Sequence, residues 1–182
     1  HRNITLSGLP VGVEKRKDMP VVNSNQVNAL QSRLEQGRLD VIDGASLTVY
    51  KSFPAGLSEA KAQEWLEKGL NDGDEGDDII RVSITTKIAN TLIPIQKDIY
   101  LDKSIEMTFR KGLENMKSFL KNKSFIIVSP EGYIIDGHHR WLSAMLIDPQ
   151  MYVQTMMINL PKDRLIDLLT TYGDAIGNER NK

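Results

Sequence analysis

Cysteine is absent from all 182 residues of the sequence. Its absence excludes disulfide bonds, zinc sites built on thiolates and catalysis by a cysteine nucleophile, and it fits a cytoplasmic setting. No apolar run approaches the roughly 20 residues that a membrane-spanning helix needs. The first residues, His1-Arg2-Asn3, do not resemble the hydrophobic segment of a secretion signal. We therefore expect a cytoplasmic protein with no membrane partner.

A large net charge is also missing, because 23 Lys and Arg residues are balanced by 24 Asp and Glu residues, which gives −1 at pH 7. Sequence-independent DNA binding depends on several Lys or Arg contacts to phosphates, and this overall balance does not supply them. Residues 97–123 hold a local excess, with seven basic and four acidic residues. This segment is either a modest basic face or a solvated helix surface.

Hydrophobic residues make up 40% of the chain and charged residues 26%, which is enough apolar material for one domain or for one domain with an extension. Within the first part, turn residues indicate an extended arm over 1–22, and apolar spacing predicts a helix over about 24–37. Residues 39–53 contain two β-prone runs around an Asp-Gly turn, and a second helix is expected over 58–73.

The stretch 72–78 contains five acidic residues among seven and superficially resembles a calcium-binding loop. However, its glycine lies at the wrong offset for an EF-hand, and no glutamate closes the loop at position twelve. We interpret 72–78 as an acidic linker. It separates an N-terminal accessory region, 1–78, from the rest of the chain.

The remainder alternates between strand and helix patterns. A strand is predicted from residue 79, a helix with an apolar stripe over 105–120, a strand over 151–159 and a last helix from Pro161 to Gly173. The stripe of the 105–120 helix is expected in the core. The pattern indicates an α+β fold with a small mixed sheet over 79–173, followed by a polar tail, 174–182.

The stretch Tyr133-Ile134-Ile135-Asp136-Gly137-His138-His139-Arg140-Trp141 is the most informative in the chain. Apolar residues run into a glycine turn and then into a cluster of ionisable groups. A preceding β-prone run and a turn at 129–132 predict a hairpin over 125–135, and apolar residues at helical spacing follow. A helix that begins near His138 directs its unpaired N–H groups back at the turn. This arrangement predicts a phosphate-binding loop.

Each residue of the predicted loop has a candidate role. Gly137 permits a sharp turn close to a ligand, and Arg140 can bind phosphate through two donors. Asp136 is either the helix cap or a Mg²⁺ ligand or general base. Adjacent helical residues diverge by about 100°, so His138 and His139 cannot chelate one ion together. One of them donates to phosphate, or both are structural.

The hydrophobic-Asp-Gly-His-His-Arg-aromatic string after a hairpin resembles the signature of the ParB/sulfiredoxin superfamily, and its form is most similar to the free serine kinase branch. Residues 92–99, Leu-Ile-Pro-Ile-Gln-Lys-Asp-Ile, look like the entry segment of phage-type ParB-like proteins. Together the two motifs cover roughly 80–170. Sulfiredoxin chemistry is excluded because it needs a cysteine in this loop.

The resemblance implies that Asp136 lies in a nucleotide pocket and that residues 92–99 face the loop. Gln96 is then a nucleotide-binding residue, with Gly137, His138, His139 and Arg140. The kinase branch has a catalytic glutamate in the segment that faces the loop, and this chain has none at those positions. Asp98 or Glu106 would take its place, so the expected catalytic residues are Asp136, His138, His139 and Asp98.

These features lead to four hypotheses of function. The first is a phosphotransferase or nucleotide hydrolase that uses ATP or ADP with Mg²⁺ held by Asp136, the acceptor hydroxyl belonging to an amino acid, a nucleoside or a modified base in phage DNA. The second is a ParB-like DNA-binding module switched by CTP. The third is a ParB-like nuclease, and the fourth is a structural domain of a phage particle. A phage-encoded protein would act in the host cytoplasm.

Overall fold

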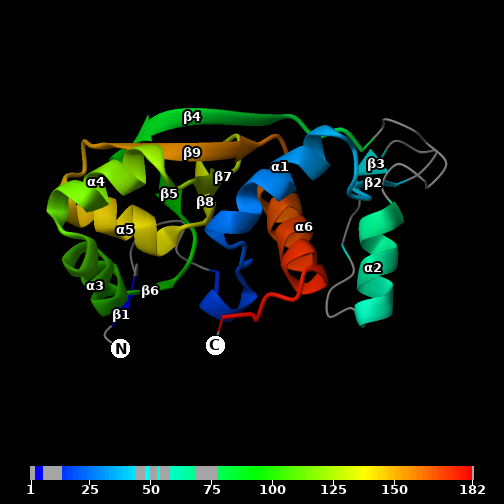
Figure 1. Cartoon of the computed structure of the whole chain (residues 1–182), viewed down its shortest axis with the longest axis horizontal. Helices are drawn as coiled ribbons and strands as arrows, with labels where there is room; N and C mark the ends of the chain where they lie inside the picture. The colour runs from blue at the N-terminus through cyan, green and yellow to red at the C-terminus, as the bar shows by residue number, and fades with distance from the viewer. Residues whose placement is uncertain are drawn as a thin grey trace.

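A five-stranded mixed sheet lies at the centre of the computed structural model, with helices packed against it (Figure 1). The strands of this sheet are β4 (Val82–Ile88), β5 (Ile93–Pro94), β7 (Ile126–Val128), β8 (Tyr133–Asp136) and β9 (Tyr152–Ile158). Their order is β4-β9-β7-β8-β5. The β4–β9 and β7–β8 pairs are antiparallel, and the β7–β9 and β5–β8 pairs are parallel.

The structure describes residues 3–5, 14–43, 48–49, 53, 58–68 and 78–181. Two pairs of short antiparallel strands lie outside the main sheet: β1 (Asn3–Thr5) with β6 (Asp98–Tyr100), and β2 (Ile42–Asp43) with β3 (Thr48–Val49). The α-helices are α1 (Val27–Glu35), α2 (Glu59–Lys68), α3 (Leu101–Lys111), α4 (Leu113–Asn122), α5 (His138–Ile147) and α6 (Lys162–Ala175). Short 3-10 turns are η1 (Arg16–Asp18), η2 (Ser24–Gln26) and η5 (Ala89–Thr91).

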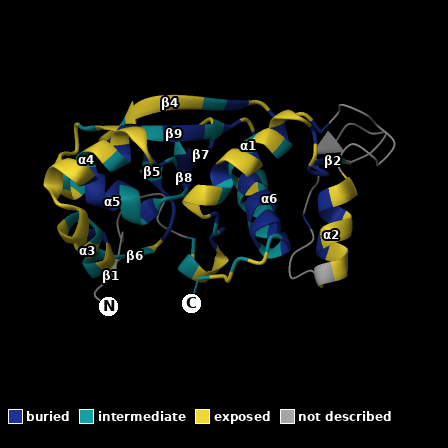
Figure 2. Ribbon diagram, viewed as in Figure 1, coloured by how far each residue is buried: buried dark blue, intermediate teal, exposed yellow. Residues whose placement is uncertain are grey.

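Helices cover both faces of the sheet, as the alternation of side chains along β7 shows. Ile126 and Val128 belong to a hydrophobic cluster with residues of α4 and α5. Ile127, between them, belongs to a second cluster with residues of α1 and α6. Successive side chains of a strand point to opposite faces, so two cores share one sheet. Figure 2 shows the buried residues along the sheet and the inner sides of these helices.

The predicted α+β class with a small mixed sheet is confirmed. The hairpin over 125–135 is present as β7 and β8, and the helix predicted to follow it is α5. The hairpin over 39–53 is present as β2 and β3, but its turn lies outside the described residues. The same holds for the predicted end of the 58–73 helix.

The single helix predicted over 105–120 is wrong, because α3 ends at Lys111 and α4 begins after Gly112. Gly112 has a φ of +76°, a left-handed conformation that side-chain-bearing residues rarely adopt and that breaks a helix. The apolar stripe predicted over 105–120 is therefore not buried along its whole length. Met116 and Leu120 of α4 are buried, but Phe109 and Leu113 are 82% and 50% exposed.

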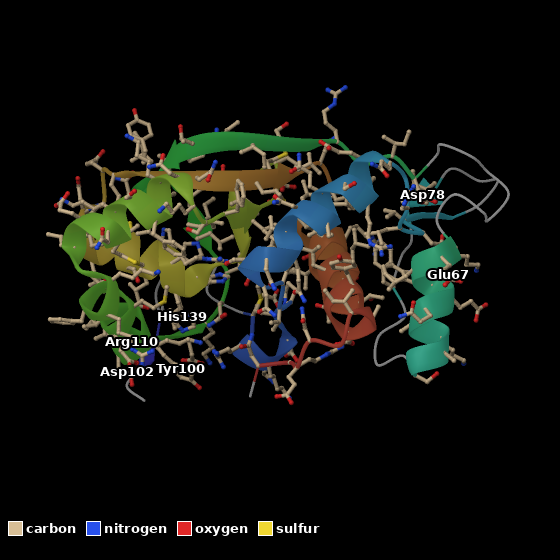
Figure 3. All side chains as sticks on the ribbon, in the orientation of Figure 1. Glu67, Asp78, Tyr100, Asp102, Arg110 and His139 are labelled. Carbon is tan, nitrogen blue, oxygen red and sulfur yellow. The ribbon has the colours of Figure 1, made fainter. Side chains whose placement is uncertain are left out.

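Two further expectations need correction. The last helix does not stop at Gly173 but continues to Ala175. The acidic stretch 72–78 lies mostly outside the described residues, but its last member, Asp78, is 1% exposed and is not a solvated linker residue. Its carboxylate accepts the backbone N–H groups of Val41 at 2.6 Å and Ile42 at 2.5 Å. Figure 3 shows Asp78 beside β2 and β3, far from His139.

Candidate functional site

The predicted turn between strand and helix is present. β8 ends at Asp136, α5 begins at His138, and Gly137 between them has a φ of +104°. A Cβ atom at Gly137 would lie 3.1 Å from Nε and Nη2 of Arg140 and 3.3 Å from Cγ1 of Ile126. The backbone conformation therefore requires glycine, and a Cβ atom would also press on Arg140 and Ile126. The first N–H groups of α5 have no acceptor within the helix.

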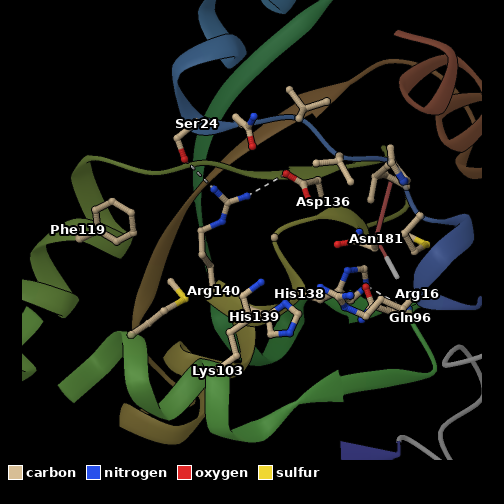
Figure 4. Close-up of a pocket in the computed structure, with 18 residues that line it drawn as sticks. Arg16, Ser24, Gln96, Lys103, Phe119, Asp136, His138, His139, Arg140 and Asn181 are labelled. Atoms are coloured by element: carbon tan, nitrogen blue, oxygen red, sulfur yellow. Dashed lines mark hydrogen bonds and ion pairs between the residues drawn. The ribbon is translucent and has the colours of Figure 1, made fainter. Parts of the chain in front are cut away.

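Arg140 folds back over this turn and holds it together. Its Nη2 donates to Oδ2 of Asp136 at 3.0 Å, and its Nη1 donates to Oγ of Ser24 at 3.2 Å (Figure 4). Gly137 occupies the cap position of α5, and Asp136 does not cap the helix. Burial raises the pKa of Asp136, and the neighbouring Arg140 opposes that rise. Of the two roles that we considered, the cap is therefore wrong.

The two histidines hold the segment around β5 and β6 against α5. Nε2 of His138 accepts the backbone N–H groups of Ile95 at 3.2 Å and Gln96 at 3.1 Å. Nε2 of His139 accepts the N–H of Tyr100 at 3.3 Å, and Figure 3 shows these two residues together. Burial lowers the pKa of His138 to about 3 and that of His139 to about 4. Both rings are therefore neutral at pH 7, with the hydrogen on Nδ1.

A cavity of about 270 Å³ opens beside this turn. Its walls come from five places: an arm that we define as residues 14–24, Gln96 after β5, the helices α3 and α4, the segment 135–140, and Asn181. Two backbone hydrogen bonds of Glu14 attach the arm to the segment after β5. The N–H of Glu14 donates to the carbonyl of Ile95 at 2.9 Å, and its carbonyl accepts the N–H of Lys97 at 2.8 Å. Segments far apart in sequence thus meet at one cavity.

The cavity is cationic. Arg16 from the arm, Lys103 from α3 and Arg140 from α5 line it, whereas Asp136 is the one carboxylate among the described lining residues. The guanidinium of Arg16 lies over the ring of Tyr100, with Cζ 4.7 Å from the ring centroid. The amino group of Lys103 forms no ion pair with any described residue. The histidines add no charge, so the arrangement favours an anionic ligand.

The structure brings most of the predicted residues together. Asp136, Gly137, His138, His139 and Arg140 all line the cavity, and so does Gln96. The side chain of Gln96 is already used in part, because Nε2 donates to the backbone carbonyl of residue 98. Asp98 itself is not among the described residues that line the cavity. The geometry therefore gives it no direct contact with a ligand there.

Sequence reasoning missed the cavity residues that lie far from the motif, which include Arg16, Ser24, Lys103, Met107, Phe119 and Asn181. Residues 1–22 were expected to be extended, and no chemistry was assigned to them. The sequence around a basic residue such as Arg16 does not indicate which distant part of the chain this residue will contact in the folded protein. Only Lys103 had a weak signal, as part of the basic excess over 97–123.

A metal ion would depend on a bound phosphate here. Among the described residues, no three His, Cys, Asp or Glu side chains gather closely enough to hold a metal. Mg²⁺ is commonly held by one or two carboxylates together with the phosphates of a substrate, and Asp136 offers one such carboxylate at the cavity. Asp136 is the one described lining residue that could contact such an ion, and its Oδ2 already pairs with Nη2 of Arg140 at 3.0 Å.

Within the described part of the chain, no helix is both long and apolar enough to cross a membrane. Comparison with known proteins found no matching family model, no matching curated protein and no matching solved structure. The resemblance to the ParB/sulfiredoxin superfamily therefore stays a prediction from the motif, and the function has to be argued from the cavity.

Proposed function

We propose that the cavity binds the phosphate groups of a nucleotide, ATP or ADP, for phosphotransfer to a hydroxyl group. The observation that carries this proposal is the convergence of three cationic side chains from separate segments, Arg16, Lys103 and Arg140, beside the beginning of α5. Helix N-termini attract anions, and guanidinium groups match the geometry of phosphate oxygens. The motif resemblance adds nucleotide as the phosphate-bearing ligand.

The expected affinity is moderate. Charge-assisted hydrogen bonds contribute about 1.5–3 kcal/mol each, so three of them give a gross ~4.5–9 kcal/mol. A micromolar Kd corresponds to about 8.2 kcal/mol. After the losses of freedom on binding, the three cations support a Kd in the micromolar range or weaker. The proposal therefore concerns a site that is measurable at ordinary protein concentrations.

Asp136 is central to the chemical step. It is the one carboxylate among the described lining residues, so it either holds Mg²⁺ or accepts the hydroxyl proton. Burial raises the pKa of Asp136, which makes its carboxylate a better proton acceptor than an exposed one. Bound Mg²⁺ supplies charge neutralisation of the phosphates. Nη2 of Arg140 lies 3.0 Å from Oδ2 of Asp136, so Arg140 would orient both this carboxylate and the bound phosphate group.

The test is calorimetric titration with ATP, ADP and CTP in the presence of Mg²⁺, on the native protein and on Arg140→Ala. We expect saturable binding that weakens about 10- to 100-fold in Arg140→Ala, because one charge-assisted contact is lost. Arg110→Ala is the matched control, since Arg110 is an exposed arginine of α3, paired with Glu106 and outside the cavity lining. It should bind like the native protein.

Two outcomes would contradict the proposal. One is equal affinity of the native protein and Arg140→Ala, and the other is no binding of any nucleotide to protein that still unfolds cooperatively. A preference for CTP would instead favour the CTP-switched module. Phosphotransfer is checked separately by ³¹P NMR of ATP mixed with amino acids, nucleosides or DNA, in which a new phosphate ester should appear with the native protein and not with Asp136→Asn.

A further inference from the structure

The cavity has two chemically different sides. Arg16 and Gln96 lie on one side of Arg140, and Phe119 lies on the other (Figure 4). Met107 of α3 also lines the cavity. A phosphate group has no favourable contact with a phenyl ring or a thioether side chain. The Phe119 side therefore fits a different part of the ligand from the phosphates.

The position of Phe119 is fixed by the fold. Its ring is partly buried against the cluster that fills the α4 and α5 side of the sheet. Its backbone carbonyl, at the end of α4, accepts the N–H of Lys123 at 2.9 Å and Oγ of Ser124 at 3.2 Å. The amino group of Lys111 lies 4.3 Å from the ring centroid, a cation–π contact that holds the ring further. A ring held in this way loses little freedom when a ligand stacks on it.

The cavity is smaller than a pocket that would bury a whole nucleotide. Pockets that bury most of a drug-sized ligand have volumes of about 300–1,000 Å³, and this cavity has about 270 Å³. A nucleotide would place its phosphates among the cations and leave its base at the edge. Aromatic rings bind bases of any sequence through their flat faces. A methionine beside them adapts its shape to the ligand.

We propose that Phe119 and Met107 form the subsite for the nucleobase, so that the ligand is a nucleoside polyphosphate and not an inorganic or sugar phosphate. This inference rests on the proposed function, because it assigns the phosphates to Arg16, Lys103 and Arg140. It adds the class of the remaining part of the ligand, an aromatic base. It also predicts tolerance among bases, because stacking does not read hydrogen-bond patterns.

Two probes separate the subsite from the phosphate site: inorganic tripolyphosphate and ATP, each titrated calorimetrically with Mg²⁺. In the native protein, ATP should bind more tightly than tripolyphosphate. In Phe119→Ala, the affinity for ATP should fall about 5- to 150-fold, the range for one lost base–aromatic stack. The affinity for tripolyphosphate should not change. Phe109→Ala is the matched control, since Phe109 is an exposed phenylalanine of α3 outside the cavity lining, and it should affect neither probe.

The outcomes are distinguishable. Equal affinity of the native protein for both probes would overturn the base subsite and leave the phosphate site intact. Absence of binding by either probe would overturn the proposed function itself. Phe119→Leu keeps apolar packing without an aromatic ring and replaces Phe119→Ala if the latter does not fold. If Phe119→Leu weakens both probes equally, or weakens neither, the assignment of the base to Phe119 is wrong.

Discussion

At the scale of residues, the two histidines of the motif are hydrogen-bond acceptors. Each uses Nε2 to accept backbone N–H groups of residues 95–100, and burial keeps each pKa well below the usual value. Their neutral form is therefore part of the folded structure. All four residues of 137–140 line the cavity, and the histidines also hold the backbone of residues 95–100 against α5.

This arrangement predicts acid sensitivity. The unfolded chain binds a proton at each histidine near pH 6.5, and the folded chain does so only near pH 3 to 4. The contribution of the histidines to the free energy of unfolding should be at its maximum above about pH 6.5. It should fall as the pH decreases, by at most about 1.4 kcal/mol per pH unit for each histidine. Urea unfolding between pH 7 and pH 4.5 measures this slope.

The variant His138→Gln isolates one of the two contributions. A glutamine amide oxygen can accept a backbone N–H but does not titrate. The slope of the unfolding free energy against pH reports how many protons are taken up on unfolding. We expect this number to be smaller by about one in the variant than in the native protein. If the slope is the same in both proteins, His138 does not remain neutral in the folded state.

The sequence correctly predicted the turn at Gly137 and the helix that follows it with Arg140 in its first turn, whereas phosphate binding by these residues stays a prediction. The turn could be predicted because a glycine between an apolar strand and a helical pattern is a local signal. For the histidines the sequence left two roles open, a phosphate contact or a purely structural one. Their acceptor role depends on the backbone of Ile95, Gln96 and Tyr100, which only the tertiary structure brings within 3.3 Å.

At the scale of elements, the contact between the arm and α6 shapes one wall of the cavity. Gly173 lies within α6, and a Cβ atom there would be 2.8 Å from the backbone carbonyl oxygen of Val21. The same carbonyl accepts Nδ2 of Asn178 at 2.7 Å. Gly173 therefore allows the arm to approach the helix closely.

The change Gly173→Ala tests this contact, because the contact decides whether the substitution stabilises or destabilises the folded protein. In an uncrowded helix the substitution would stabilise the protein by about 1 kcal/mol. Here the new methyl group meets backbone, so we expect destabilisation of about 1–3 kcal/mol and weaker nucleotide binding. Thermal unfolding and calorimetry measure the two effects. A higher melting temperature would show that the arm is not tightly packed at this point.

The break between α3 and α4 illustrates what periodicity does not predict. Apolar residues from 105 to 120 follow one helical spacing, but Gly112 separates them into two helices. The side of α3 that packs against α5 includes Ser104, whose carbonyl accepts Oγ of Ser143 at 2.9 Å. A small, polar residue thus occupies the contact, and the larger Phe109 remains exposed. Close packing between helices favoured the smaller side chain.

At the scale of the whole molecule, one hydrophobic core spans both sides of the predicted linker. Val27, Leu30 and Leu34 of α1 belong to the same cluster as Leu165 and Leu168 of α6. We therefore expect that a polypeptide of residues 79–182 does not fold cooperatively, although it contains the complete motif. Its α6 and one face of the sheet would be left uncovered.

Circular dichroism and thermal unfolding of the 79–182 fragment test this expectation, with the full chain as the reference. Loss of a cooperative transition is the expected result. A fragment that unfolds cooperatively near the temperature of the full chain would show that residues 14–43 are dispensable for folding. The same fragment also lacks Arg16, so its nucleotide affinity would then report the contribution of the arm.

The walls of the cavity have a consequence for the order of folding. Arg16 and Asn181, which both line it, are separated by 165 positions, and the motif lies between them. Contacts of such long sequence separation form late, because much chain entropy is lost in closing the loop. During synthesis, a nascent chain that has reached Ile147 already carries the motif but not α6, against which the arm packs. The pocket can therefore be completed only after residue 181 has left the ribosome.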